Sequence, residues 1–141
     1  MKKTILTLIA MILVLTFAAV SQTTQKHRVV LQINVDSPDS WNQLFGNIGN
    51  IQKSFGADKI QIEVVTYGKG LGLLLKTNSA YEERMKKAIA TGVVLAACQN
   101  SMRTRNITTQ DLFPFASQVD SGVAELVRKQ EAGWSYIRAG E

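Results

Sequence analysis

Strand-like and helix-like patterns alternate along most of this chain, and the alternation restricts the folds open to it. Residues 28–35 (RVVLQINV) place apolar side chains at every second position, which is typical of a β-strand. A helix is predicted next, because Ser37 can cap it, Pro38 suits its first turn and apolar residues follow at steps of three and four. Gly56 stands where such a helix ends.

The same alternation continues to the end of the chain. Residues 60–65 (IQIEVV) and 93–98 (VVLAAC) predict two more strands, and the latter is apolar on both faces, as in a strand covered on two sides. Ser79 and Glu82 have the spacing of a capping box, ahead of a helix that ends near Gly92. The remaining predicted elements are a helix at 99–105, a short strand at 117–120, a helix capped by Ser121 and a strand at 134–138.

Five strands that alternate with helices predict a single three-layer α/β domain with a mainly parallel five-stranded sheet. Right-handed crossovers leave few strand orders, and a flavodoxin-like order is expected at this size. The length of 141 residues fits one domain, because a domain usually takes roughly 100–200 residues. In such sheets ligand sites lie at the carboxyl ends of the strands, so candidate functional residues are sought there.

The N-terminus has the pattern of an export signal. Lys2 and Lys3 precede an almost uninterrupted apolar run at residues 5–20, which is shorter than the roughly 20 residues of a membrane-spanning helix. Small residues follow, and cleavage after Ser21 leaves residues 22–141. We therefore predict a cleavable signal peptide at residues 1–21, a periplasmic or secreted protein, and no membrane attachment after cleavage. The alternative is an uncleaved anchor.

Composition excludes several classes of protein. The chain has one cysteine, so neither an intramolecular disulfide nor a cysteine-cluster metal site can form. The formal net charge of +5 includes Lys2 and Lys3, so residues 22–141 carry +3, spread along the chain, which does not indicate nucleic-acid binding. Paired carboxylates, a Ser–His–Asp set and a metal-ligand cluster do not stand out in the sequence, so no cofactor and no metal are expected.

Cys98 is the candidate reactive residue. It ends a predicted strand just before a predicted helix, whose free N–H groups and partial positive charge favour a thiolate. Gln99, Asn100 and Ser101 supply polar groups around the sulfur, and Arg103 adds positive charge. Such a thiol can accept sulfur as a persulfide or form a mixed disulfide with a partner. The alternative is a buried cysteine that acts as a small core hydrophobe.

A glycine-rich segment follows the second predicted strand. Residues 68–72 (GKGLG) lack the spacing of a dinucleotide or P-loop phosphate site, so we interpret them as a flexible rim loop. Lys69 and Gly70 then belong to the predicted surroundings of Cys98, because both segments follow strand ends. Leucines at 71 and 73–75 would add exposed apolar surface to such a loop and so favour oligomerisation, unless they are internal core.

Several blocks of sequence share a pattern with a known family. They are Tyr67-Gly68-Lys69-Gly70, residues 92–100 (GVVLAACQN), residues 119–126 (VDSGVAEL) and residues 130–137 (QEAGWSYI). With the first strand and helix, they make nearly all of residues 28–141 resemble the DsrE/DsrF-like family, the YchN-like sulfur-relay fold. The sequence departs from the family pattern at Asp120, where proline is common, and at Lys69, where the loop often has proline.

The resemblance carries expectations of its own. It implies a DsrE-like strand order and homo-oligomers, commonly trimers or hexamers. In the sulfur-relay members, a cysteine at the position of Cys98 carries a persulfide and passes it to a partner protein.

Two functions follow as hypotheses. The first is an exported sulfur-carrier or thiol-relay protein that uses Cys98 and a donor or acceptor protein, and such an activity is transferase-like rather than that of a metabolic enzyme. The second is an oligomeric ligand-binding or structural protein in which Cys98 belongs to the core. A reactive thiol of low pKa favours the first, and a buried, unreactive thiol favours the second.

Overall fold

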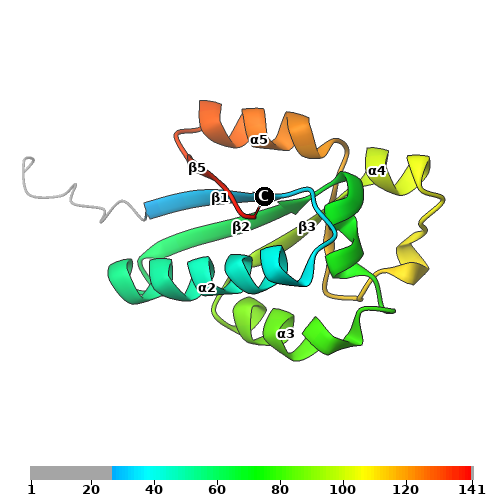
Figure 1. Cartoon of the computed structure of the whole chain (residues 1–141). Helices are drawn as coiled ribbons and strands as arrows, with labels where there is room; N and C mark the ends of the chain where they lie inside the picture. Colours follow the sequence, from blue (N-terminus) through cyan, green and yellow to red (C-terminus); the bar gives the residue numbers. More distant parts are fainter. Residues whose placement is uncertain (1–26, 141) are drawn as a thin grey trace, which may run out of the picture.

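The computed structural model describes residues 27–140 and has the expected α/β architecture, with one five-stranded parallel sheet (Figure 1). The predicted signal peptide lies outside the described residues. The strands are β1 (His27–Ile33), β2 (Ile60–Thr66), β3 (Val94–Cys98), β4 (Ser117–Val119) and β5 (Ser135–Arg138). The α-helices are α2 (Pro38–Phe55), α3 (Glu82–Ala90), α4 (Gln99–Thr104) and α5 (Gly122–Glu131), and the 3-10 helices are η1 (Gly68–Leu74), η2 (Ser79–Tyr81) and η3 (Thr109–Asp111).

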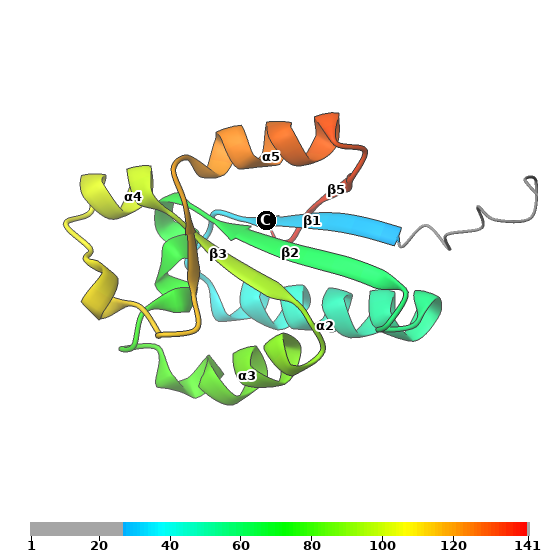
Figure 2. The ribbon, with the colours of Figure 1, turned by 180° about the vertical axis from the view of Figure 1, so that it is seen from behind.

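The strand order is β4-β3-β2-β1-β5, and every neighbouring pair is parallel. In the flavodoxin order β1 lies between β2 and β3, whereas here it lies between β2 and β5, so that part of the expectation is wrong. The chain moves in one direction from β1 to β4 and then returns to the far side of β1. Right-handed crossovers therefore place α2 and α3 on one face and α5 on the other (Figures 1 and 2).

Helix α2 begins and ends where local chemistry predicts. The Ser37 side chain caps it by accepting a hydrogen bond from the N–H of Ser40 at 3.5 Å, and Pro38 occupies the first turn. Gly56 follows the last turn with a φ of 87°, a backbone conformation that glycine adopts without strain. Among residues 27–140, no helix combines the length and the apolar character that a membrane span needs.

Two apolar clusters pack on the sheet. The larger joins it to α2 and α3 and includes Leu31, Leu44, Val64, Met85 and Leu95. The smaller consists of Val30, Val65 and Leu126, with Tyr67 and Trp134 partly buried against it. Since Leu126 is on α5, the second cluster joins α5 to the opposite face of the sheet.

The glycine-rich segment is not a flexible rim loop. Residues 68–74 form η1, and Leu71, Leu73 and Leu74 are 0% exposed in the larger cluster. The connection from β2 to α3 packs against the larger apolar cluster, so these leucines fill the core instead of forming a surface. They therefore give no support to oligomerisation.

The predicted cap of α3 is also wrong. Ser79 starts η2, and α3 begins at Glu82 after Tyr81, without a side-chain capping hydrogen bond. The Tyr81 ring instead packs edge-on against Trp41 at 5.2 Å between centroids, which fixes the approach of the chain to α3. A capping box is present at η3, where Thr108 and Asp111 exchange hydrogen bonds.

Candidate functional site: the Cys98 thiol

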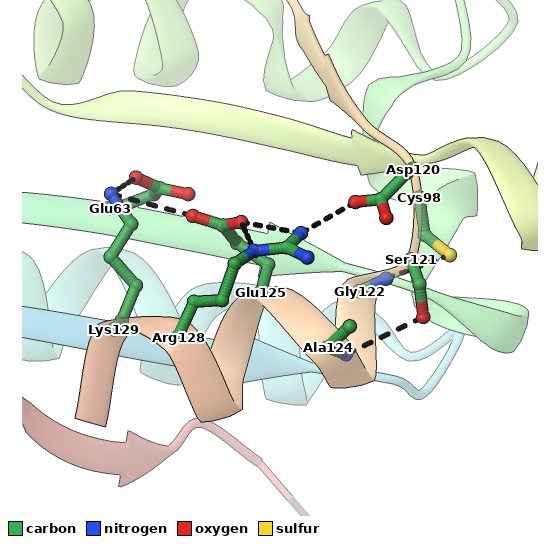
Figure 3. A network of polar contacts seen from close by, with 9 residues as sticks. All are labelled: Glu63, Cys98, Asp120, Ser121, Gly122, Ala124, Glu125, Arg128 and Lys129. Atoms are coloured by element: carbon green, nitrogen blue, oxygen red, sulfur yellow. Dashed lines mark hydrogen bonds and ion pairs between the residues drawn. The ribbon is translucent and has the colours of Figure 1, made fainter. Parts of the chain in front are cut away.

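Cys98 is the last residue of β3 and the N-cap of α4. It lies at the carboxyl edge of the sheet, next to the first turn of α5 (Figure 3). Successive strand residues point to opposite faces, and since Ala97 belongs to the larger cluster, the Cys98 side chain faces α5. The residue is only 3% exposed. The thiol is thus placed between the starts of two helices and almost covered.

Hydrogen-bond donors surround the sulfur. The N–H of Gly122 donates to Sγ at 3.1 Å, and the N–H of Ser101 donates at 3.4 Å. The Ser101 hydroxyl adds a side-chain hydrogen bond to the sulfur. Its oxygen accepts from the N–H of Gly68 at 2.8 Å, so its hydrogen is free to point at Sγ. This arrangement suits a sulfur that carries negative charge.

Two opposing effects set the pKa of the Cys98 thiol. Burial raises this pKa and is the largest single effect, but the hydrogen bonds from the Ser101 hydroxyl and from the N–H groups of Gly122, Ser101 and Asn100 together outweigh it. The pKa therefore lies below the ordinary value of a cysteine. A larger fraction of Cys98 is thiolate at neutral pH than in a free cysteine, and the thiolate is the nucleophile.

The predicted polar neighbours of Cys98 lie at different places around it. Asn100 contributes its backbone N–H at the sulfur, and that N–H also donates to the Asp120 carbonyl at 3.2 Å. The side chain of Gln99 turns to Gln118, at 3.3 Å between Nε2 and Oε1. The Arg103 guanidinium donates to the side-chain oxygen of Asn100. Of these residues, Asn100 acts on the pKa of the Cys98 thiol, through its backbone N–H.

Lys69 and Gly70 have different surroundings. The Lys69 residue is exposed, and its backbone carbonyl accepts a hydrogen bond from Arg105 at 3.3 Å. Gly70 is buried against the end of β1, where an added Cβ would lie 2.4 Å from the carbonyl oxygen of Ile33. Gly70 therefore allows close backbone packing next to the site.

Gly122 and Tyr67 also belong to the site, although neither was predicted to lie near the sulfur. Gly122 is 24 residues from Cys98 and touches it because the chain leaves β4, the neighbour of β3, and crosses back over the sheet. Tyr67 follows β2 and lies close to Gly122, because a Cβ added to Gly122 would be 3.0 Å from the Cβ of Tyr67. Burial raises the pKa of Tyr67, and Tyr136 and Cys98 raise it further while Arg138 lowers it.

Replacing Ser101 tests the charge on the sulfur. In Ser101→Ala the side-chain hydrogen bond is lost, so we expect the pKa of Cys98 to rise and alkylation at pH 7 to become several times slower. The measurement is the pH dependence of the rate with iodoacetamide, whose midpoint should move upward. Ser117→Ala is the matched control, because its hydroxyl donates to the Leu95 carbonyl at 3.0 Å, away from the sulfur. An unchanged midpoint in Ser101→Ala contradicts the assigned hydrogen bond.

Several solved structures resemble this chain, including two proteins of unknown function. The protein of unknown function MTH1491 from Methanobacterium thermoautotrophicum is 32% identical with a TM-score of 0.76, over 80% of this chain and 99% of that one. The conserved protein of unknown function BT1422 from Bacteroides thetaiotaomicron is 13% identical with a TM-score of 0.64, over 84% of this chain and 99% of that one, and shows the fold alone. No curated protein matches the sequence.

A family model agrees with the sequence blocks around the site. The model of the DsrE/DsrF-like family matches residues 13–139, which is most of the chain. This range includes β3 with Cys98 and the start of α5 with Gly122. This chain belongs to the DsrE/DsrF-like family.

Proposed function

We propose that this protein is an exported sulfur carrier, which accepts sulfur as a persulfide on Cys98 and passes it to a partner protein. One observation supports the proposal above all: donors from Ser101, Gly122 and Asn100 converge on the sulfur and lower the pKa of its thiol. Membership of a sulfur-relay-related family supports the same chemistry. The chain would then act as a transferase-like carrier rather than as a metabolic enzyme.

The proposed chemistry consists of two thiol exchange steps. In the first, the Cys98 thiolate attacks the outer sulfur of a persulfide or polysulfide, a new S–S bond forms, and the donor leaves as a thiolate with the electron pair of the broken S–S bond. In the second, the partner's thiolate attacks the outer sulfur on Cys98, and Cys98 leaves as a thiolate. The donors around Sγ favour the first step because they increase the fraction of Cys98 that is thiolate, and they favour the second because a thiolate of lower pKa leaves faster.

The burial of Cys98 favours a second candidate function. A cysteine that is 3% exposed can serve as a small core residue. The protein would then be an oligomeric ligand-binding or structural protein without thiol chemistry. The two candidates differ in whether Cys98 reacts while the fold is intact.

We further propose that the mature protein forms homo-oligomers, either trimers or hexamers. Three exposed apolar side chains on α5 and β5 support this: Val123 is 58%, Val127 49% and Tyr136 41% exposed. Strand β5 has four residues and pairs with β1 on one side, so its other edge keeps backbone groups that a second chain can engage. Sedimentation velocity of the mature chain tests the proposal, and a monomer at all concentrations contradicts it.

The function is tested by intact mass after incubation with inorganic polysulfide. We expect wild type to gain one sulfur atom on Cys98, reversibly on addition of reductant, and Cys98→Ser to gain none. The serine variant is a fair comparison because its hydroxyl can still accept from the N–H of Gly122. Unfolding curves must show that both proteins are folded under the assay conditions. A folded wild type without an adduct favours the core-cysteine alternative.

A further inference from the structure

The cover over Cys98 must move before the sulfur can react. The first turn of α5 lies directly on the thiol, since the N–H of Gly122 is 3.1 Å from Sγ. The contact is close, because a Cβ added to Gly122 would lie 3.2 Å from the Cβ of Cys98. A nucleophilic sulfur that is almost covered reacts in proportion to the time its cover is open. The forces that hold α5 in place therefore control access to the thiol.

Apolar contacts attach α5 weakly to the sheet. Leu126 is its buried apolar side chain and packs against Val30 and Val65, whereas Val123 and Val127 are exposed. Helix α2, by comparison, buries Trp41, Leu44 and Ile48. Because α5 buries one large apolar side chain, other contacts must help to hold it against the sheet.

Ion pairs also hold α5 on the sheet (Figure 3). Lys129 on α5 forms an ion pair with Glu63 on β2, and the two side chains are only 22% and 8% exposed. Lys129 also lies 3.6 Å from Glu125 and places its ammonium 4.3 Å from the centre of the Trp134 ring. Because the pair is largely shielded from water, removal of one partner leaves the other charge uncompensated.

The charged network extends from Lys129 to the segment that covers Cys98. Glu125 accepts a hydrogen bond from Arg128 at 2.9 Å, and Arg128 is also paired with Asp120. Asp120 lies two residues before Gly122, and its carbonyl accepts from the N–H of Asn100 at 3.2 Å. This series of contacts thus connects Glu63 on β2, along α5, with the first residues of α4 and α5 beside the thiol.

We propose that Lys129 is a positioning residue, which holds α5 closed over Cys98 through Glu63 and Glu125, so that the thiol is reached when the start of α5 lifts. The proposal deepens the proposed function and rests on it, because it describes how access to the sulfur carrier's thiol is regulated. It differs from a purely structural role, since it couples the ion pair to both the reactivity and the ionisation of Cys98.

Lys129→Met removes the charge and keeps the unbranched apolar part of the side chain. Glu63 then lacks its closest cation, so we expect α5 to open more often and the rate of iodoacetamide alkylation, on the plateau above the pKa of the thiol, to rise roughly tenfold. The midpoint of the pH profile should also rise, because the N–H of Gly122 spends less time on the sulfur. Loss of stability alone does not move that midpoint in a folded protein.

The chain offers a matched control on the other face of the sheet. Lys86 on α3 pairs with Glu82 at 2.8 Å and with Glu83 at 3.1 Å, so Lys86→Met also removes a lysine shared by two carboxylates. We expect its plateau rate and its pH midpoint to match those of wild type. Glu63→Gln serves as a second variant if Lys129→Met does not fold, and it should change both readouts in the same direction.

The outcomes separate this proposal from the proposed function. It is overturned if folded Lys129→Met and Glu63→Gln keep the wild-type plateau rate and midpoint, or if wild-type Cys98 is alkylated as fast as a cysteine in a short peptide. The persulfide adduct of wild type is measured independently by mass. Suppose that the variants are alkylated faster but wild type forms no persulfide adduct. Then α5 does cover the thiol, and the protein is not a sulfur carrier.

Discussion

Gly70→Ala is expected to lower the free energy of unfolding by about 3 kcal/mol or more. The new methyl group would lie 2.4 Å from the carbonyl oxygen of Ile33 and 2.8 Å from the Cα of Asn34. Both are backbone atoms at the end of β1, and the Ile33 carbonyl also accepts from the N–H of Tyr67 at 3.2 Å. Relief of the overlap therefore requires η1 or the end of β1 to move.

Denaturant unfolding measures this effect, and α2 provides the control. A Cβ added at Gly46 or Gly49 meets no atom within 4 Å, and both glycines lie inside the helix. Alanine there should raise the free energy of unfolding by up to about 1 kcal/mol, because glycine is the poorer helix former. If Gly70→Ala unfolds within about 1 kcal/mol of wild type, the close packing of η1 on β1 is not required.

Gly122→Ala is expected to raise the pKa of Cys98 and to increase the plateau rate of its alkylation. The added methyl group would lie 3.0 Å from the Cβ of Tyr67 and 3.2 Å from the Cβ of Cys98. Both Cβ atoms are bonded directly to the backbone and cannot rotate away, so the start of α5 must shift outward. The hydrogen bond from residue 122 to Sγ then lengthens, at a cost in stability of about 1–2 kcal/mol.

The pH dependence of alkylation measures both changes in Gly122→Ala. Its midpoint should move to higher pH, since a weaker hydrogen bond stabilises the thiolate less. Val123→Ala is a suitable control, because Val123 lies in the same turn of α5 and is exposed. A midpoint at or below the wild-type value would show that the N–H of Gly122 does not stabilise the thiolate.

Local chemistry made much of the fold predictable. The ends of α2 depend on residues next to one another in the sequence. Ser37 caps its start by a hydrogen bond, and the backbone preferences of Pro38 and Gly56 suit its first turn and its end. The apolar run before Cys98 indicated a strand covered on both faces, and β3 has α5 on one face and α3 on the other. The strand order was harder to predict, because more than one order satisfies the right-handed rule and nothing in the sequence of β1 shows which strands lie beside it.

The site was predictable only in part, for a related reason. The position of Cys98 before a helix depends on adjacent residues, so its sulfur could be assigned to the N-terminus of α4 from sequence. Gly122 comes from a distant segment and reaches the sulfur through the strand order. The sequence left open whether the leucines of η1 are surface or core, because their burial depends on how the connection from β2 packs against distant parts of the chain.

Because a sulfur atom is the N-cap of α4, a persulfide on Cys98 would change the hydrogen bonding at the start of that helix. The thiolate accepts from the N–H of Ser101, which satisfies a backbone group at the first turn. A persulfide turns this atom into a neutral inner sulfur and moves the negative charge one bond outward, so the cap weakens, and a lost cap costs roughly 1 kcal/mol. If the protein is the sulfur carrier proposed above, its empty and loaded forms would have differently ordered first turns of α4, and a partner protein could tell them apart.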